Sequence, residues 1–117
     1  MSVKVENVKP QGFVLLRYND PKVGEYHKLF VSWRDDEWRL SSGCDLSKLK
    51  DLGQYWELEQ FSGSVYTFPK GEEDGYTFYT GRVLENIIGQ NGLEGVGIRR
   101  VKLADELNRH SITPIKG

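Results

Sequence analysis

The sequence predicts an α+β fold in which a mainly antiparallel sheet is packed by one helix, at about residues 82–90, with a further short helix near the C-terminus. Eight of the fourteen aromatic residues lie between Tyr55 and Tyr79, at spacings typical of strands. After them the apolar spacing becomes helical, so a helix can lay its apolar stripe on the sheet. At 117 residues, the chain is expected to form a single domain over residues 1–117.

The first half of the chain is predicted to form strands separated by turns. Its apolar segments alternate with polar residues or are bounded by proline and acidic residues. Strands are predicted at residues 3–8, 12–18, 26–34 and 38–40. Asp35-Asp36-Glu37 separates the last two strands, which predicts a hairpin. Asp45 is then expected to cap a short helical piece that holds Leu46 and Leu49.

Residues 55–79 are predicted to form a three-stranded antiparallel meander. The second strand places Tyr66 and Phe68 on one face, and the third places Tyr76 and Phe78 on one face, as in a pleated strand. Two polar segments, residues 62–64 and the acidic loop 70–75, are expected to be the turns. The rings are expected either to form a core or to expose a binding platform.

The main helix is predicted from four apolar residues at helical spacing, Val83, Leu84, Ile87 and Ile88. Thr80 or Gly81 is its expected N-cap, and Gly89 or Gly92 is expected to end it. A last strand and a short terminal helix are predicted for residues 96–103 and 104–110.

Composition and charge restrict location and partners. A single cysteine, Cys44, excludes an intrachain disulfide, and the opening residues lack a secretory signal pattern, so a cytoplasmic location is expected. The longest apolar run, residues 13–16, is far shorter than the roughly 20 residues of a spanning helix, so no membrane segment is expected. Residues 51–94 carry two positive and eight negative groups (−6), whereas residues 95–117 carry five and two (+3).

No motif predicts a cofactor or a metal. None of the thirteen glycines is followed by lysine, so a Walker-type phosphate loop is absent. The acidic loop fails as a calcium-binding EF-hand, because Lys70 and Gly81 would occupy positions that require carboxylates. His27, His110 and Cys44 lack the spacing of a transition-metal site, and no pattern predicts that folding unites them. We therefore expect no bound cofactor and no metal.

The leading functional prediction is binding to another protein through an aromatic sheet face and the acidic loop. Tryptophan and tyrosine dominate interface hot spots, and here they stand next to clustered acidic charge. The expected binding residues are Trp56, Tyr66, Phe68, Tyr76, Glu72, Glu73 and Asp74. One variant is that the protein inhibits a nucleic-acid-handling protein by presenting carboxylates that imitate phosphates, those of Glu57, Glu59, Glu72, Glu73 and Asp74. The sequence does not predict the partner, and it is also compatible with a homodimer through an exposed edge strand.

Two other classes stay open. Nucleic-acid binding is the alternative, through the basic stretch Arg99, Arg100 and Lys102. It is not favoured, because single-strand binding needs aromatics interleaved with basic residues, whereas the aromatic-rich segment is acidic. A less favoured hypothesis is a small enzyme in which Cys44 is the nucleophile and His27 or His110 the base.

Overall fold

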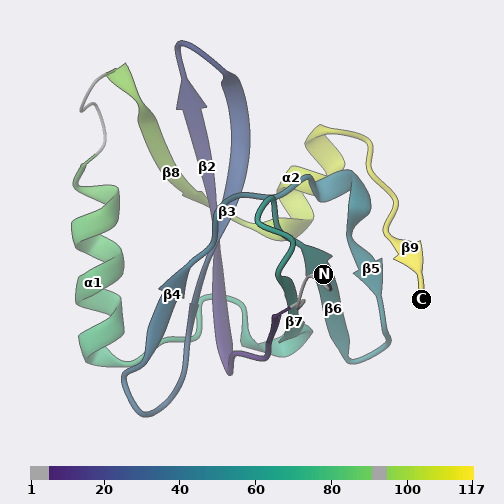
Figure 1. Ribbon diagram of the computed structural model, residues 1–117, viewed down its shortest axis with the longest axis horizontal. Helices are drawn as coiled ribbons and strands as arrows, with labels where there is room; N and C mark the ends of the chain where they lie inside the picture. The colour runs from purple at the N-terminus through teal and green to yellow at the C-terminus, as the bar shows by residue number, and fades with distance from the viewer. Residues whose placement is uncertain (1–5, 91–94) are drawn as a thin grey trace, which may run out of the picture.

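The computed structural model describes residues 6–90 and 95–117 and has an α+β fold (Figure 1). One described sheet has the strand order β1-β7-β6-β5-β9: β1 (Asn7–Val8), β5 (Lys50–Asp51), β6 (Tyr55–Glu59), β7 (Val65–Pro69) and β9 (Ile115–Lys116). The other has the order β4-β3-β2-β8: β2 (Gly12–Asp20), β3 (Gly24–Ser32), β4 (Trp38–Leu40) and β8 (Gly97–Val101). The helical elements are α1 (Phe78–Ile88), α2 (Leu103–Arg109) and the 3-10 turns η1 (Leu46–Lys48) and η2 (Lys70–Glu72).

The four-stranded sheet is the centre of the fold and is antiparallel throughout. Successive residues of β2 enter different cores, because side chains alternate across a strand. Phe13 and Leu15 pack toward the second sheet, whereas Val14 and Leu16 pack toward α1. A strand buried on both faces explains the unbroken apolar run at residues 13–16.

The second sheet packs against the face of the central sheet that α1 does not cover (Figure 1). Its β6 and β7 are antiparallel and are the first two predicted meander strands, which are confirmed. The rings of Phe13 and Phe68 meet between the sheets, with centroids 4.6 Å apart. Two further pairings, β1 with β7 and β5 with β9, are parallel, and β9 was not predicted.

The third predicted meander strand, at residues 76–79, is wrong. Helix α1 begins there, because Thr77 and Thr80 form a capping box. The Thr77 hydroxyl accepts the Thr80 N–H at 3.1 Å, and the Thr80 hydroxyl accepts the Thr77 N–H at 2.8 Å. The helix therefore starts at Phe78 and not near residue 82, and Thr77, not Thr80 or Gly81, is its N-cap.

Most of the remaining predicted elements are confirmed. The hairpin is β3–β4, and Asp45 caps η1 by accepting the Ser47 N–H at 3.0 Å. Gly89 ends α1, while the other predicted stop, Gly92, lies outside the described residues. The predicted late strand and terminal helix are β8 and α2. Part of the predicted first strand, Val3 and Val5, also lies outside the described residues.

Candidate functional site

The predicted aromatic face is divided between core and surface. Tyr66 and Phe68 are buried between the sheets, so they are not available on the surface of this fold. Trp56 is half-buried, with Lys70 Nζ 4.2 Å from its ring centroid. Tyr76 is exposed. The four rings therefore do not form one exposed platform.

The acidic loop and the basic stretch contact each other. Arg100 Nη2 donates to Asp74 Oδ1 at 3.0 Å, and Lys102 forms an ion pair with the other Asp74 oxygen. Glu73 accepts the backbone N–H of Leu103, the first residue of α2, at 2.7 Å. The acidic loop was predicted to bind a protein and the basic stretch a nucleic acid, but in the structure these two segments bind each other. Within the loop, Glu72 is exposed.

Arg99, the remaining predicted basic residue, lies on the opposite face of β8 from Arg100. It stands directly across from Arg17 in the register of β8 with β2. Arg100 instead lies over the ring of Tyr76, with 5.5 Å between the guanidinium carbon and the ring centroid. The three predicted basic residues nevertheless border one surface hollow, together with Arg17 and Arg109 and with the carboxylates of Asp74, Asp105 and Glu106.

Cys44 is buried beside the backbone of β3. Burial raises the pKa of its thiol to about 12, and the nearby Asp45 carboxylate adds to the rise. The thiol Sγ donates to the carbonyl of His27 at 3.5 Å. The thiolate that a nucleophile requires is therefore disfavoured at neutral pH, although Cys44 and both histidines line one surface hollow.

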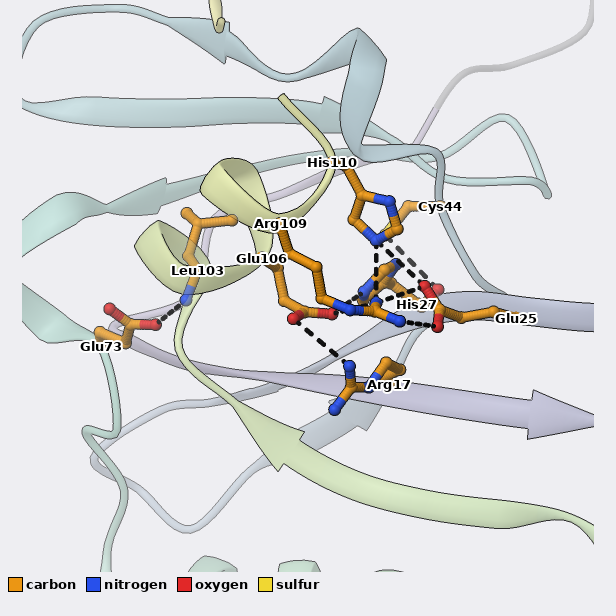
Figure 2. A network of polar contacts seen from close by, with 9 residues as sticks. All are labelled: Arg17, Glu25, His27, Cys44, Glu73, Leu103, Glu106, Arg109 and His110. Carbon is orange, nitrogen blue, oxygen red and sulfur yellow. Dashed lines mark hydrogen bonds and ion pairs between the residues drawn. The ribbon is translucent and has the colours of Figure 1, made fainter. Parts of the chain in front are cut away.

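A polar cluster under α2 is the most connected group of charged side chains in the described residues (Figure 2). This α2 cluster consists of Arg17, Glu25, His27, Glu106, Arg109 and His110. Arg17 and His27 are cross-strand neighbours on β2 and β3. The helix residues Glu106 and Arg109, with His110 at the helix end, face them from above.

The buried part of the α2 cluster joins His27 to Glu106. His27 Nε2 donates to Glu106 Oε1 at 2.8 Å, and both side chains are buried. The other oxygen, Glu106 Oε2, lies 3.6 Å from Arg17 Nη1. A buried carboxylate needs such partners, because an unpaired charge in the interior is strongly destabilising.

The outer part of the α2 cluster is organised by Arg109. Its Nη1 and Nη2 donate to the two Glu25 oxygens, each at 2.8 Å, which is a bidentate pair. These hydrogen bonds lower the pKa of Glu25 to about 2, against the opposing effect of burial. His110 Nε2 lies 3.0 Å from Glu25 Oε2 and 3.1 Å from Arg109 Nη1.

Sequence reasoning missed this cluster except for its histidines. Two local signals were present. Glu25 and His27 are two apart, at the start of the predicted strand 26–34, which the structure extends back to Gly24, so they share a face. Glu106, Arg109 and His110 are three and four apart around a predicted helix, so they also share a face. No local pattern indicated that the two faces meet.

A second surface feature surrounds the start of α1. We use the name aromatic surface for four exposed side chains there, Trp38, Tyr76, Phe78 and Tyr79. The side chain of Phe78 is 83% exposed and that of Tyr79 is 54% exposed. The Thr77 hydroxyl donates to Asp36 Oδ1 at 2.6 Å, which ties the start of α1 to the β3–β4 loop two residues before Trp38.

Comparison of the chain with protein-family models, curated proteins and solved structures found no match. In the described part of the chain, no helix combines the length and the apolar character needed to cross a membrane. The function is therefore inferred from the side chains themselves.

Proposed function

We propose that this protein acts in the cytoplasm by binding another protein through the aromatic surface and the adjoining β3–β4 loop. The exposure of Phe78 carries this proposal. A phenylalanine that is 83% exposed at the first position of a helix contributes little to its own core. Tyr79, the next residue along the chain, is exposed as well, and large exposed aromatic side chains are common interface hot spots.

The charge beside the aromatic surface indicates the chemistry of the partner. The β3–β4 loop presents three consecutive exposed acidic residues, Asp35, Asp36 and Glu37. Complementary charge favours a protein partner that presents a basic and apolar face. The same three carboxylates would repel a phosphate backbone that approached this loop.

The backbone of the aromatic surface is held in place before any partner arrives. The capping box fixes the first turn of α1, and the Thr77–Asp36 hydrogen bond fixes this turn against the loop. Arg82 lies over the ring of Phe78, with 6.0 Å between the guanidinium carbon and the ring centroid. A preorganised surface loses less entropy on binding, which favours affinity.

The experiment has two stages. The tagged wild-type protein captures a partner from its source cells, with and without nuclease, and the purified pair is then studied by calorimetry. Phe78→Ser tests the aromatic surface, and Asp35→Lys tests the β3–β4 loop. Val23→Ser is the matched control, because Val23 is an apolar residue in the β2–β3 turn that is 73% exposed, against 83% for Phe78.

Phe78→Ser is expected to weaken the purified complex by roughly thirtyfold or more, as for a hot-spot residue that contributes about 2 kcal/mol. Asp35→Lys is expected to lower the affinity for a basic partner, and more strongly at low salt than at high salt. Val23→Ser is expected to leave the affinity unchanged. Equal affinities for wild type and Phe78→Ser would reject the proposal. So would loss of every partner after nuclease, or a homodimer that Phe78→Ser dissociates.

A further inference from the structure

We propose that Glu25, His27, Glu106 and His110 form a binding site for one divalent transition-metal ion. Each residue offers one ligand atom, and the four atoms lie within 4.8 Å of one another. Two imidazoles with two carboxylates suit Zn²⁺, whereas Ca²⁺ and Mg²⁺ prefer sites made of oxygen alone. The chain has only two histidines, and the fold places both in this cluster.

The spacing of the ligand atoms is close to what a tetrahedral ion requires. Metal–ligand bonds of 2.0–2.2 Å separate the ligand atoms by about 3.3 Å. His27 Nε2 and Glu106 Oε1 are 2.8 Å apart, and His110 Nε2 and Glu25 Oε2 are 3.0 Å apart. One pair is buried and fixed, while the other lies at the surface, where small rotations can close the remaining distance.

The guanidinium of Arg109 places a positive charge among the four ligand atoms. Its Nη1 lies 2.8 Å from Glu25 Oε2, 3.1 Å from His110 Nε2 and 3.6 Å from Glu106 Oε1. It therefore contacts three of the four ligand atoms. The Arg109 side chain is 46% exposed, so it can turn into solvent when a metal ion takes its place.

Metal binding needs a particular tautomer of each histidine. His110 Nε2 lies between a donor, Arg109 Nη1 at 3.1 Å, and an acceptor, Glu25 Oε2 at 3.0 Å, and it binds a metal ion in the tautomer whose Nε2 carries no proton. The Nε2 of His27 carries a proton in its bond to Glu106. Metal binding through this nitrogen requires the neutral tautomer protonated at Nδ1, so the proton leaves Nε2 for Nδ1 through solvent.

Two further features fit a metal site. Arg17 lies near Glu106 Oε2 and leaves Oε1 directed at the other ligands, as an outer-shell partner does. A surface hollow of about 440 Å³ borders Glu25, His27 and His110 and offers an entry path. A bound ion would connect β3 to α2, so it would raise the thermal stability of the protein.

The test uses the full-length, untagged protein, with Zn²⁺ in calorimetry and Co²⁺ in visible absorption. Wild type is expected to bind one ion of each per chain, and Co²⁺ to show the intense bands of a tetrahedral site. His110→Gln and Glu25→Gln remove ligands at the surface, so neither should prevent folding. Each of these two variants should bind Zn²⁺ at least roughly 10- to 100-fold more weakly than wild type, since that is the loss typical of removing even an outer-shell partner. Asp105→Asn, on the same helix, is the matched control and should bind as wild type does.

Arg109→Ala separates a metal site from a simple ion-pair network, and circular dichroism verifies that each variant is folded. Loss of the competing guanidinium should tighten Zn²⁺ binding severalfold, and Arg109→Gln provides the same comparison should the alanine variant not fold. Absence of one-to-one binding in both wild type and the Arg109 variant would overturn the proposal. Weaker binding by the Arg109 variant, or Zn²⁺ affinity unchanged by His110→Gln, would also overturn it.

Discussion

His27 Nε2 donates to Glu106 Oε1 at 2.8 Å across 79 positions of sequence. Both side chains are buried, one on a central strand and one on α2. The pair therefore attaches the C-terminal helix to the central sheet.

Glu106→Gln is expected to lower the free energy of unfolding by about 3 kcal/mol, since removing one partner leaves the other buried group poorly compensated. Urea denaturation followed by circular dichroism measures this change. Asp105→Asn, at an exposed neighbouring position, should change stability by no more than about 0.5 kcal/mol. Equal losses in the two variants would show that the buried pair has no special role.

Glu73→Ala is expected to destabilise the protein by about 1 kcal/mol, as the loss of a helix cap does. The N-cap residue of α2, Lys102, makes no side-chain capping bond, and Glu73 accepts the Leu103 N–H instead. Glu72→Ala, in the same loop but exposed, is the control. Amide hydrogen exchange in α2 should be faster in the Glu73 variant alone, and unchanged exchange would contradict this capping role.

Asp74→Asn tests how the acidic loop contributes to stability as pH changes. Burial alone would raise the pKa of Asp74, but hydrogen bonds from Lys102 and Arg100 outweigh it and lower this pKa. The stabilisation is thus complete above the pKa of an unfolded aspartate and is lost as pH falls through the lower folded value. Asparagine suits the substitution, because it tolerates the positive φ of residue 74.

The free energy of unfolding of Asp74→Asn is expected to be about 1 kcal/mol below that of wild type at pH 7, and the gap should close in acid. Denaturation curves between pH 7 and pH 2 measure both values. A constant gap over this range would show that the charge of Asp74 is not the cause.

Gly12→Ala is expected to be one of the most damaging small substitutions in the chain. A Cβ at residue 12 would collide with the backbone carbonyl of Gly75, which cannot move as a flexible side chain can. Overpacking of this kind costs about 1–3 kcal/mol, occasionally more. Gly71→Ala is the control, because no atom lies within 4 Å of a Cβ there. Similar melting temperatures for the two variants would contradict the close approach.

Cys44 is expected to resist alkylation in the folded protein. Its thiol is buried, and burial raises its pKa to about 12, so the reactive thiolate is scarce at neutral pH. Iodoacetamide labelling followed by mass spectrometry should show slow modification in buffer and fast modification in urea. Fast labelling of the native state would return Cys44 to consideration as a nucleophile.

Local spacing was sufficient for much of the fold. The apolar run at residues 13–16, the β3–β4 hairpin, the Asp45 cap and the Gly89 stop each depend on residues a few positions apart. Local spacing led to a wrong prediction at residues 76–79, because Tyr76 and Phe78 are two positions apart, a spacing that also fits a strand. The reciprocal cap between Thr77 and Thr80 favours the helix there, and it leaves Phe78 and Tyr79 exposed.

Local patterns alone led to the α+β class and to the acidic and basic segments, because each depends on near neighbours in sequence. Three features were decided only by the tertiary structure: the burial of Tyr66 and Phe68, the pairing of Asp74 with Arg100, and the meeting of His27 with Glu106. Their partners are brought together by sheet pairing and helix packing. A contact between residues tens of positions apart leaves no period in the local sequence, so only the folded chain reveals it.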